Sequence, residues 1–164
     1  MWRNLFSFPN PVNEVSARLV AGGVVIMAAA TLIFDLRWLA VVIAYGFLAR
    51  VASGPTLSPL GQLVTRVVTP RLPVAARPVA GPPKRFAQGM GAVLTTTAAV
   101  LWVGFGFATA GKVLLGLVIV AAVLESVFAF CIGCKVFALL MRANLIPDSV
   151  CAECADITLR QKPA

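Results

Sequence analysis

Long apolar stretches that are almost free of charge constrain the fold of this chain more than any other feature. Four of them begin near Leu19, Trp38, Phe86 and Val113. A helix needs about 20 predominantly apolar residues to cross the hydrocarbon core of a bilayer. Only 12% of the residues are charged, whereas a soluble domain carries about 25%. The sequence therefore predicts an all-α membrane protein.

Four transmembrane helices are predicted, at residues 18–35, 37–53, 86–109 and 112–141. The first two are short, and the second spans a bilayer only if Arg37 and Arg50 extend their charged ends to the headgroups. Short connections predict two antiparallel hairpins, the second of which turns at residues 110–111. We therefore expect a membrane domain of residues 1–146, followed by a Cys-containing cytoplasmic tail of residues 147–164.

Positive charge gathers on one side of this predicted topology. The connection between the second and third helices is rich in proline, Arg and Lys and holds no acidic residue. Lys and Arg accumulate in the cytoplasmic loops of membrane proteins, so we expect this loop and both termini in the cytoplasm. Within the loop, residues 57–68 form either a short interfacial helix or an extended segment. The net charge of +8 thus follows from topology, and no basic–aromatic pattern indicates nucleic-acid binding.

The cysteines form two C-x2-C pairs, Cys131 with Cys134 and Cys151 with Cys154. Such pairs either bind a soft metal or cycle between thiol and disulfide. All four thiolates together could hold zinc in a closed structural site, which would make the protein a non-enzymatic membrane scaffold. A reducing cytoplasm disfavours permanent disulfides but allows transient ones. The chain has no histidine, which excludes mixed Cys/His zinc sites and catalytic triads with His.

The second predicted hairpin brings two polar segments to the same depth. Residues equidistant from its turn lie level, so residues 84–88 are expected beside residues 131–135. Arg85 and Lys135 are then the cations that favour a thiolate on the first cysteine pair. Gln88 would hydrogen-bond this thiolate or a bound ligand. In the alternative interpretation, Arg85 and Gln88 mark only the membrane boundary.

Two backbone geometries are open for the first cysteine pair. On an unbroken helix, Cys131, Cys134 and Lys135 share one face through their i, i+3 and i, i+4 spacing. Gly133 could instead break the helix and leave Cys131 near the start of a new one. The positive end of the helix dipole would then also favour the thiolate.

Glu125 is the only carboxylate inside a predicted span. A charged acid near mid-membrane costs several kcal/mol, so we expect its side chain to be protonated or hydrogen-bonded. The hairpin places it opposite Thr96 and the two neighbouring threonines, whose hydroxyls would bind it and join the two helices. The alternative is a proton relay or a substrate contact, as in a small transporter subunit.

Several short motifs resemble a known family. They are Asn10-Pro11-Val12-Asn13-Glu14-Val15 with Arg18, Gly54-Pro55, Ser58-Pro59-Leu60, Pro82-Pro83-Lys84-Arg85-Phe86-Ala87-Gln88 and Phe130-Cys131-Ile132-Gly133-Cys134. This pattern is similar to a family of bacterial membrane proteins known as domain of unknown function 4395. The resemblance implies a compact four-helix, multi-pass protein of the bacterial plasma (inner) membrane, common in actinobacteria. It also implies thiol or sulfur chemistry, through its neighbourhood with thioredoxin-like and sulfurtransferase proteins.

The favoured hypothesis joins the cysteine chemistry to this resemblance. Cys131 and Cys134 would face the cytoplasm and exchange disulfides, or carry sulfur, with a soluble thioredoxin-like or sulfurtransferase partner. The lipid bilayer is the other expected partner, and zinc is the one cofactor that the cysteines suggest.

Overall fold

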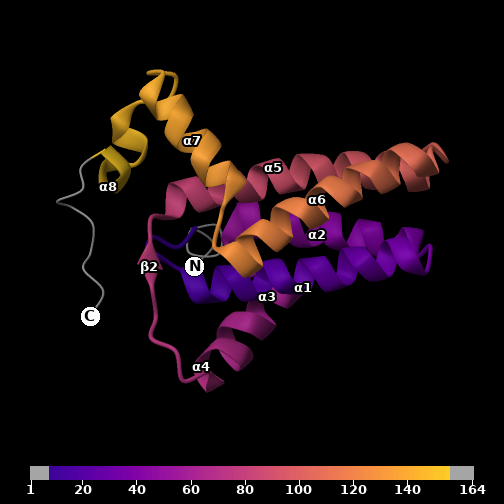
Figure 1. Ribbon diagram of the computed structural model, residues 1–164, viewed down its shortest axis with the longest axis horizontal. Coiled ribbons are helices and arrows are strands. Elements are labelled where there is room, and N and C mark those ends of the chain that lie inside the picture. Colours follow the sequence, from indigo (N-terminus) through magenta and orange to yellow (C-terminus); the bar gives the residue numbers. More distant parts are fainter. Residues whose placement is uncertain (1–7, 156–164) are drawn as a thin grey trace.

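Four long helices form a bundle in the computed structural model, which describes residues 8–155 (Figure 1). They are α1 (Glu14–Ile33), α2 (Arg37–Ser53), α5 (Gly81–Ala99) and α6 (Ala108–Phe128). Both α1 and α5 pack against α2 and against α6, so the four helices surround a common core. Figure 1 shows the two short turns, residues 34–36 and 105–107, together at one end of the bundle.

Among the described residues, three stretches are long and apolar enough to cross a membrane: Glu14–Ile33, Gly81–Gly104 and Ala108–Phe128. The second of them joins α5 to a π-helical segment, η3 (Val100–Gly104). Helix α2 lies in the same bundle and has 17 residues. The predicted class, a mainly helical protein with helices suited to a membrane, is therefore confirmed.

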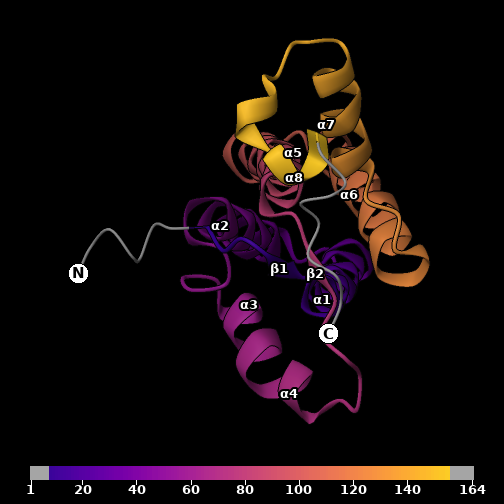
Figure 2. The ribbon, with the colours of Figure 1, turned by 90° about the vertical axis from the view of Figure 1, so that its left-hand side faces the viewer.

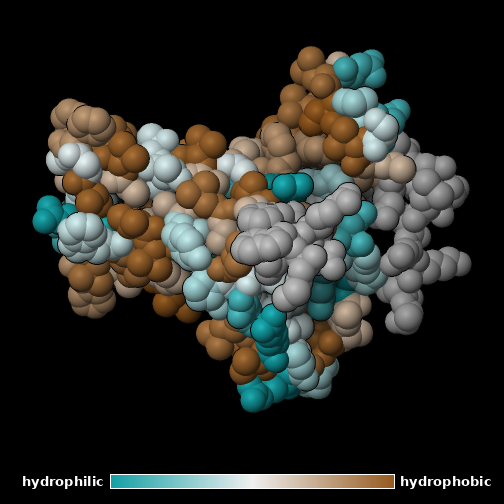
Figure 3. All heavy atoms as spheres, turned by 180° about the vertical axis from the view of Figure 1, so that it is seen from behind, coloured by the Kyte–Doolittle hydropathy of each residue, from teal (hydrophilic) through white to brown (hydrophobic). Residues whose placement is uncertain are grey.

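The surface of the bundle is apolar, and the core includes several small side chains beside larger ones such as Phe47 and Trp102. Ala28, Ala40 and Ala98 are fully buried, which allows the helix backbones to approach closely. Ile26 on α1 and Val93 on α5 are instead 73% and 68% exposed. Figure 3 shows apolar side chains over the long helices, with hydrophilic ones gathered toward the ends. Large exposed apolar groups and close helix contacts at alanine suit lipid as the surrounding solvent.

The proline-rich connection contains a short helical stretch. It consists of α3 (Pro59–Leu63), η2 (Val64–Val68) and α4 (Thr69–Arg71). Figure 2 shows α3 and α4 on one side of the bundle, while α7 and α8 lie on the opposite side. Of the two conformations considered for this loop, the helical one is present and the fully extended one is not.

An N-terminal strap ties the first and third long helices together. Strand β1 (Val12–Asn13) pairs antiparallel with β2 (Pro78–Val79), just before α5. The Asn13 side chain caps α1 by accepting a hydrogen bond from the Val15 N–H at 3.1 Å. The Asn10 side chain accepts from the Gly81 N–H at 2.8 Å, at the start of α5. Two residues of the motif that opens the chain therefore fix where two helices begin.

Two predicted boundaries of the second helix pair were wrong. Helix α5 begins at Gly81, not at residue 86, because Pro82 and Pro83 occupy its first turn, where their missing N–H groups cost nothing. The turn between α5 and α6 lies around Gly106, whose φ is 75°, and not at residues 110–111. Moving this turn changes which residues of the two helices lie level.

The last predicted span, 112–141, is broken. Helix α6 ends at Phe128, Ala129 adopts a left-handed conformation with φ 54°, and α7 (Ile132–Arg142) begins anew. Arg18 of α1 satisfies the end of α6 by donating from Nε and from an Nη to the Ser126 carbonyl at 3.1 and 3.0 Å. Two short helices follow α7, namely η4 (Asp148–Val150) and α8 (Ala152–Ala155). The rest of the predicted tail lies outside the described residues.

Candidate functional site

A cavity of about 290 Å³ lies within the helix bundle where α7 begins, with lining residues from α1, α2, α5, α6 and α7. Its walls are mostly apolar, and four side chains with polar or reactive groups contribute to them: Arg50, Gln88, Glu125 and Cys131. Ligand pockets have volumes of about 300–1,000 Å³, so the cavity matches a small group. The cavity therefore has an apolar lining with a few polar groups that point into the same space.

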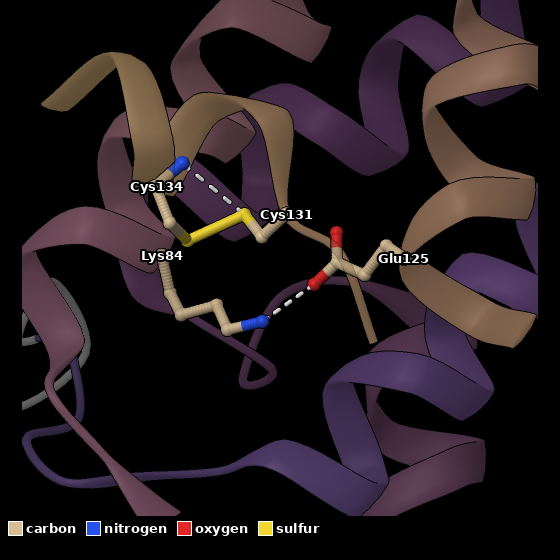
Figure 4. Close-up of a disulfide and its surroundings, with 4 residues drawn as sticks. All are labelled: Lys84, Glu125, Cys131 and Cys134. Atoms are coloured by element: carbon tan, nitrogen blue, oxygen red, sulfur yellow. Dashed lines mark hydrogen bonds and ion pairs between the residues drawn. A yellow bond between two sulfur atoms is a disulfide. The ribbon is translucent and has the colours of Figure 1, made fainter. Parts of the chain in front are cut away.

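The first cysteine pair sits at the start of α7, beside this cavity (Figure 4). Cys131 and Cys134 are joined as a disulfide, and their Cα atoms are 5.2 Å apart. Cys131 is the N-cap residue of α7, and its sulfur accepts a hydrogen bond from the Cys134 N–H at 3.3 Å. Of the two geometries considered from the sequence, the new helix start is therefore the one present. On reduction, this helix terminus favours a thiolate at Cys131.

The two cysteines differ in accessibility. Cys131 is only 9% exposed and lines the cavity, whereas Cys134 is half-buried and is not part of the cavity wall. Cys131 therefore faces the bundle interior, and Cys134 is the less buried residue of the pair. The two cysteines of the disulfide therefore have different surroundings.

A glycine holds the cysteine pair against α5. A Cβ atom on Gly133 would lie 2.5 Å from the Ala87 Cα, a distance that no real pair of non-bonded carbon atoms adopts. Helix α7 therefore approaches α5 as closely as it does only because position 133 has no side chain. The expected neighbourhood of residues 84–88 and 131–135 is present, and the chain reaches it through the helix break at Ala129.

An ion pair between Lys84 and Glu125 lies next to the disulfide in Figure 4. The Lys84 Nζ lies 2.7 Å from the Glu125 Oε1, and the two side chains are 11% and 16% exposed. Glu125 was expected to bond to Thr96, which is wrong: the Thr96 hydroxyl is buried with no hydrogen-bond partner among the residues described. The connection between α5 and α6 comes earlier in the sequence than predicted. Glu125 is therefore level with the N-terminal part of α5.

Arg50 supplies the second buried cation and was missed as a site residue. It is 5% exposed, and its Nε donates to the Gln88 Oε1 at 2.9 Å. Another guanidinium nitrogen donates to the Ser58 hydroxyl at 3.3 Å, and the group lies 4.4 Å from the centre of the Phe47 ring. Arg50 was expected from the sequence to extend toward headgroups, but its partners hold it inside. Its place within an otherwise apolar run was the sequence feature that could have identified it as a site residue.

The two cations predicted to support the thiolate are exposed and make other contacts. Arg85 is exposed, and its Nε donates to the Val51 carbonyl at 3.0 Å. Lys135 is exposed, with its ammonium 5.8 Å from the centre of the Phe130 ring. Lys84, one residue before Arg85, faces the interior instead. Gln88 is the one predicted supporting residue that lines the cavity.

Comparison with known families agrees with the motifs. Residues 12–142 match the family described as a domain of unknown function, DUF4395. The chain belongs to this family. No curated protein and no solved structure matches it. The DUF4395 segment contains the cavity and the pair Cys131–Cys134, and it ends before Cys151.

The second cysteine pair lies outside the DUF4395 segment. Cys151 and Cys154 form their own disulfide, and Cys151 is buried against Phe137 and Met141 of α7. The two pairs are thus separate, and within residues 8–155 no cluster of three or more Cys, Asp or Glu side chains is placed to hold a metal. The four-cysteine arrangement that a zinc site requires is not formed in this structure.

Proposed function

We propose that this DUF4395 protein is a membrane-embedded thiol–disulfide exchange protein. Cys131 and Cys134 would exchange with a soluble thioredoxin-like partner, and the observation that carries this proposal is their unequal placement. Cys134 is the less buried residue of the pair and lies outside the cavity wall, while Cys131 caps α7 and lines the cavity. A disulfide used in catalysis suits a reducing compartment, where structural ones do not persist.

The exchange would begin at the more accessible sulfur. A thiolate of the partner attacks the Cys134 sulfur, the Cys131–Cys134 bond breaks, and Cys131 leaves as a thiolate. A low-pKa thiol leaves faster, and the start of α7 together with the Cys134 N–H stabilises this leaving group. The second partner thiolate then attacks the partner sulfur that is bonded to Cys134. The partner leaves as a disulfide and both cysteines of this chain remain as thiols.

Trapping the mixed disulfide tests this order. In the Cys131→Ser variant, with Cys151 and Cys154 also replaced by serine, Cys134 is activated as a mixed disulfide with thionitrobenzoate. A thioredoxin whose second active-site cysteine is replaced by serine then attacks Cys134, and no thiol of either protein is left to resolve the product. We expect a stable mixed disulfide on non-reducing gels with thioredoxin as the probe. The Cys134→Ser variant, which keeps only the buried Cys131, should form little adduct. Equal trapping by both variants, or by neither, would contradict the proposed roles.

The same proposal includes a topology. The four helices of the bundle would each cross the plasma membrane of a bacterial cell, as two antiparallel hairpins, with α2 aided by Arg37 at its end. Supporting this, the basic loop, α7 and both cysteine pairs lie at the end of the bundle opposite the two turns (Figure 1). By the positive-inside rule, that end and both termini face the cytoplasm.

Cysteine labelling in intact cells tests the topology. With Cys134 as the sole cysteine, a membrane-impermeant maleimide should react only after the membrane is opened. With Thr109→Cys as the sole cysteine, in the exposed turn end of α6, the same reagent should react from outside. Labelling of Cys134 in intact cells would exclude a cytoplasmic site.

The alternative functions have less support from the geometry. A zinc scaffold requires all four cysteines to converge, and they are paired separately. A transporter that carries a proton or a cation on Glu125 would require this carboxylate to exchange its charge partner during the cycle, and it is paired with Lys84. Sulfur transfer from a sulfurtransferase would use the same accessible Cys134 and stays a variant of the proposed function.

A further inference from the structure

We propose that the cavity binds the ring of a lipid-soluble quinone, which reoxidises Cys131 and Cys134. This inference rests on the proposed exchange function and names its electron acceptor. Each cycle with a soluble dithiol leaves this chain with two thiols, so turnover requires a two-electron oxidant. The cavity contacts Cys131 from the bundle interior, away from the polar end of the molecule where the soluble partner would dock.

The reaction balances with a quinone. When the Cys131 and Cys134 thiols form a disulfide, they release two electrons and two protons. A quinone takes up two electrons and two protons and becomes a quinol. No further co-reactant is consumed, and the quinol leaves by the route that the quinone entered.

The cavity opens toward the apolar outer surface of the bundle. Leu117 and Val120 of α6 line it and are 53% and 57% exposed, so they belong to both the cavity and the lipid-facing surface. Met90 and Leu94 of α5 continue the apolar lining. A ligand dissolved in the bilayer reaches such a site from the side, and its long apolar tail remains in lipid.

The polar groups in the cavity suit a quinone ring. The Gln88 carbonyl oxygen is occupied by Arg50, which fixes the orientation of the amide. Its Nε2 group makes no hydrogen bond within the described part of the chain and can donate to a quinone carbonyl. Glu125 lines the same cavity and can accept from the hydroxyl of the quinol.

An anionic lipid is a poorer occupant. Its headgroup would require a free cation, but Lys84 is paired with Glu125, and Arg50 is bonded to Gln88 and Ser58. The Glu125 carboxylate would also repel a second negative charge in the same cavity. A neutral ring with two acceptor oxygens satisfies the available donor without adding charge.

The test uses reduced full-length protein in mild detergent, carrying Cys151→Ser and Cys154→Ser so that one cysteine pair is counted. After anaerobic removal of reductant, decylubiquinone is added as the probe, because its fully substituted ring does not take up thiols by simple addition. Quinol is followed by ultraviolet absorbance and thiols by alkylation and mass spectrometry. We expect one quinol for each Cys131–Cys134 disulfide formed.

Two variants locate the reaction in the cavity. Leu117→Trp fills the opening and should slow quinone reduction by about tenfold or more, a loss equal to a modest change in binding free energy. Val113→Trp, on an exposed α6 position that does not line the cavity, should react like the parent. Gln88→Glu keeps an oxygen acceptor for Arg50 and removes the Nε2 donor, so it should raise the KM for the quinone about fivefold through loss of one hydrogen bond.

Exchange with thioredoxin, measured on every variant, shows that the protein is folded and separates the two proposals. Intact exchange without quinol formation would overturn the quinone site and leave the exchange function standing. Equal quinone rates in Leu117→Trp and Val113→Trp would also overturn it. Failure of both exchange and quinone reduction in the parent would overturn both.

Discussion

Replacing Lys84 with methionine is expected to lower the free energy of unfolding by about 3–5 kcal/mol, the cost of leaving one member of a buried ion pair without its partner. Methionine has a similar length and fills the space, so the loss would come from the uncompensated Glu125 carboxylate. The measurement is reversible unfolding in mixed micelles of a mild detergent and SDS. Glu125→Gln added to this variant should restore much of the stability, because it removes the orphaned charge.

An exposed ion pair in the same chain provides the matched control. Lys112 and Asp35 are paired at the turn end of the bundle, and their side chains are 41% and 66% exposed. Lys112→Met should cost about 1 kcal/mol or less, because solvent screens such a pair. Equal losses at Lys84 and Lys112 would show that the Lys84–Glu125 pair is solvated and is not a fixed part of the site.

The apolar runs predicted long helices in these parts of the chain, but they did not predict which residues of α5 and α6 lie level. Depth arithmetic requires the position of the turn, and the turn lies around Gly106. The sequence offers Gly104, Gly106 and Gly111 as similar turn candidates, and nothing local distinguishes them. Helix phase is likewise not fixed by depth, so Arg85 was chosen where Lys84 faces inward.

A helix break near the first cysteine pair was one of the two geometries that the sequence allowed, but the cause of the break could not be seen in the sequence. Ala129 takes the left-handed conformation, a role usually filled by glycine. The end of α6 is stabilised by Arg18, a residue more than a hundred positions away. Such a tertiary cap cannot be inferred from local propensity. Gly133, suspected as the breaker, instead serves the close contact between α7 and α5.

The motifs that resemble the family are explained by the fold in two different ways. Asn10 and Asn13 cap helices through their side chains, so these positions serve architecture. Lys84 and Gln88, in the motif that runs from Pro82 to Gln88, contribute the ion pair and the cavity wall. In the sequence alone, the capping residues and the site residues look alike, because both are polar residues between apolar segments. Only the three-dimensional contacts separate the structural residues from the chemical ones.

Substitution of Gly133 by alanine should disable exchange while leaving both cysteines in place. The added methyl group would meet the Ala87 backbone at 2.5 Å, and a backbone atom cannot rotate away as a side-chain tip can. Helix α7 must therefore shift off α5, which costs about 1–3 kcal/mol as overpacking does. The disulfide moves with α7, because Cys131 and Cys134 flank the substituted residue. We expect the rate of exchange with thioredoxin to fall about tenfold, in line with the steep dependence of reactivity on the geometry of the reacting groups.

Gly116→Ala is the matched control for this substitution. Gly116 lies on α6, and apart from the adjoining backbone of its own helix no atom lies within 4 Å of the place that an alanine methyl group would take there, so the added group has room. Alanine is favoured over glycine in a helix interior by about 1 kcal/mol, and this variant should be as stable as the parent or slightly more so. The same intrinsic gain is available at position 133, which makes a net loss there a direct measure of the α5–α7 contact. If Gly133→Ala unfolds and exchanges like Gly116→Ala, α7 does not depend on this close approach, and the cysteine pair is not held against α5 as the proposed mechanism requires.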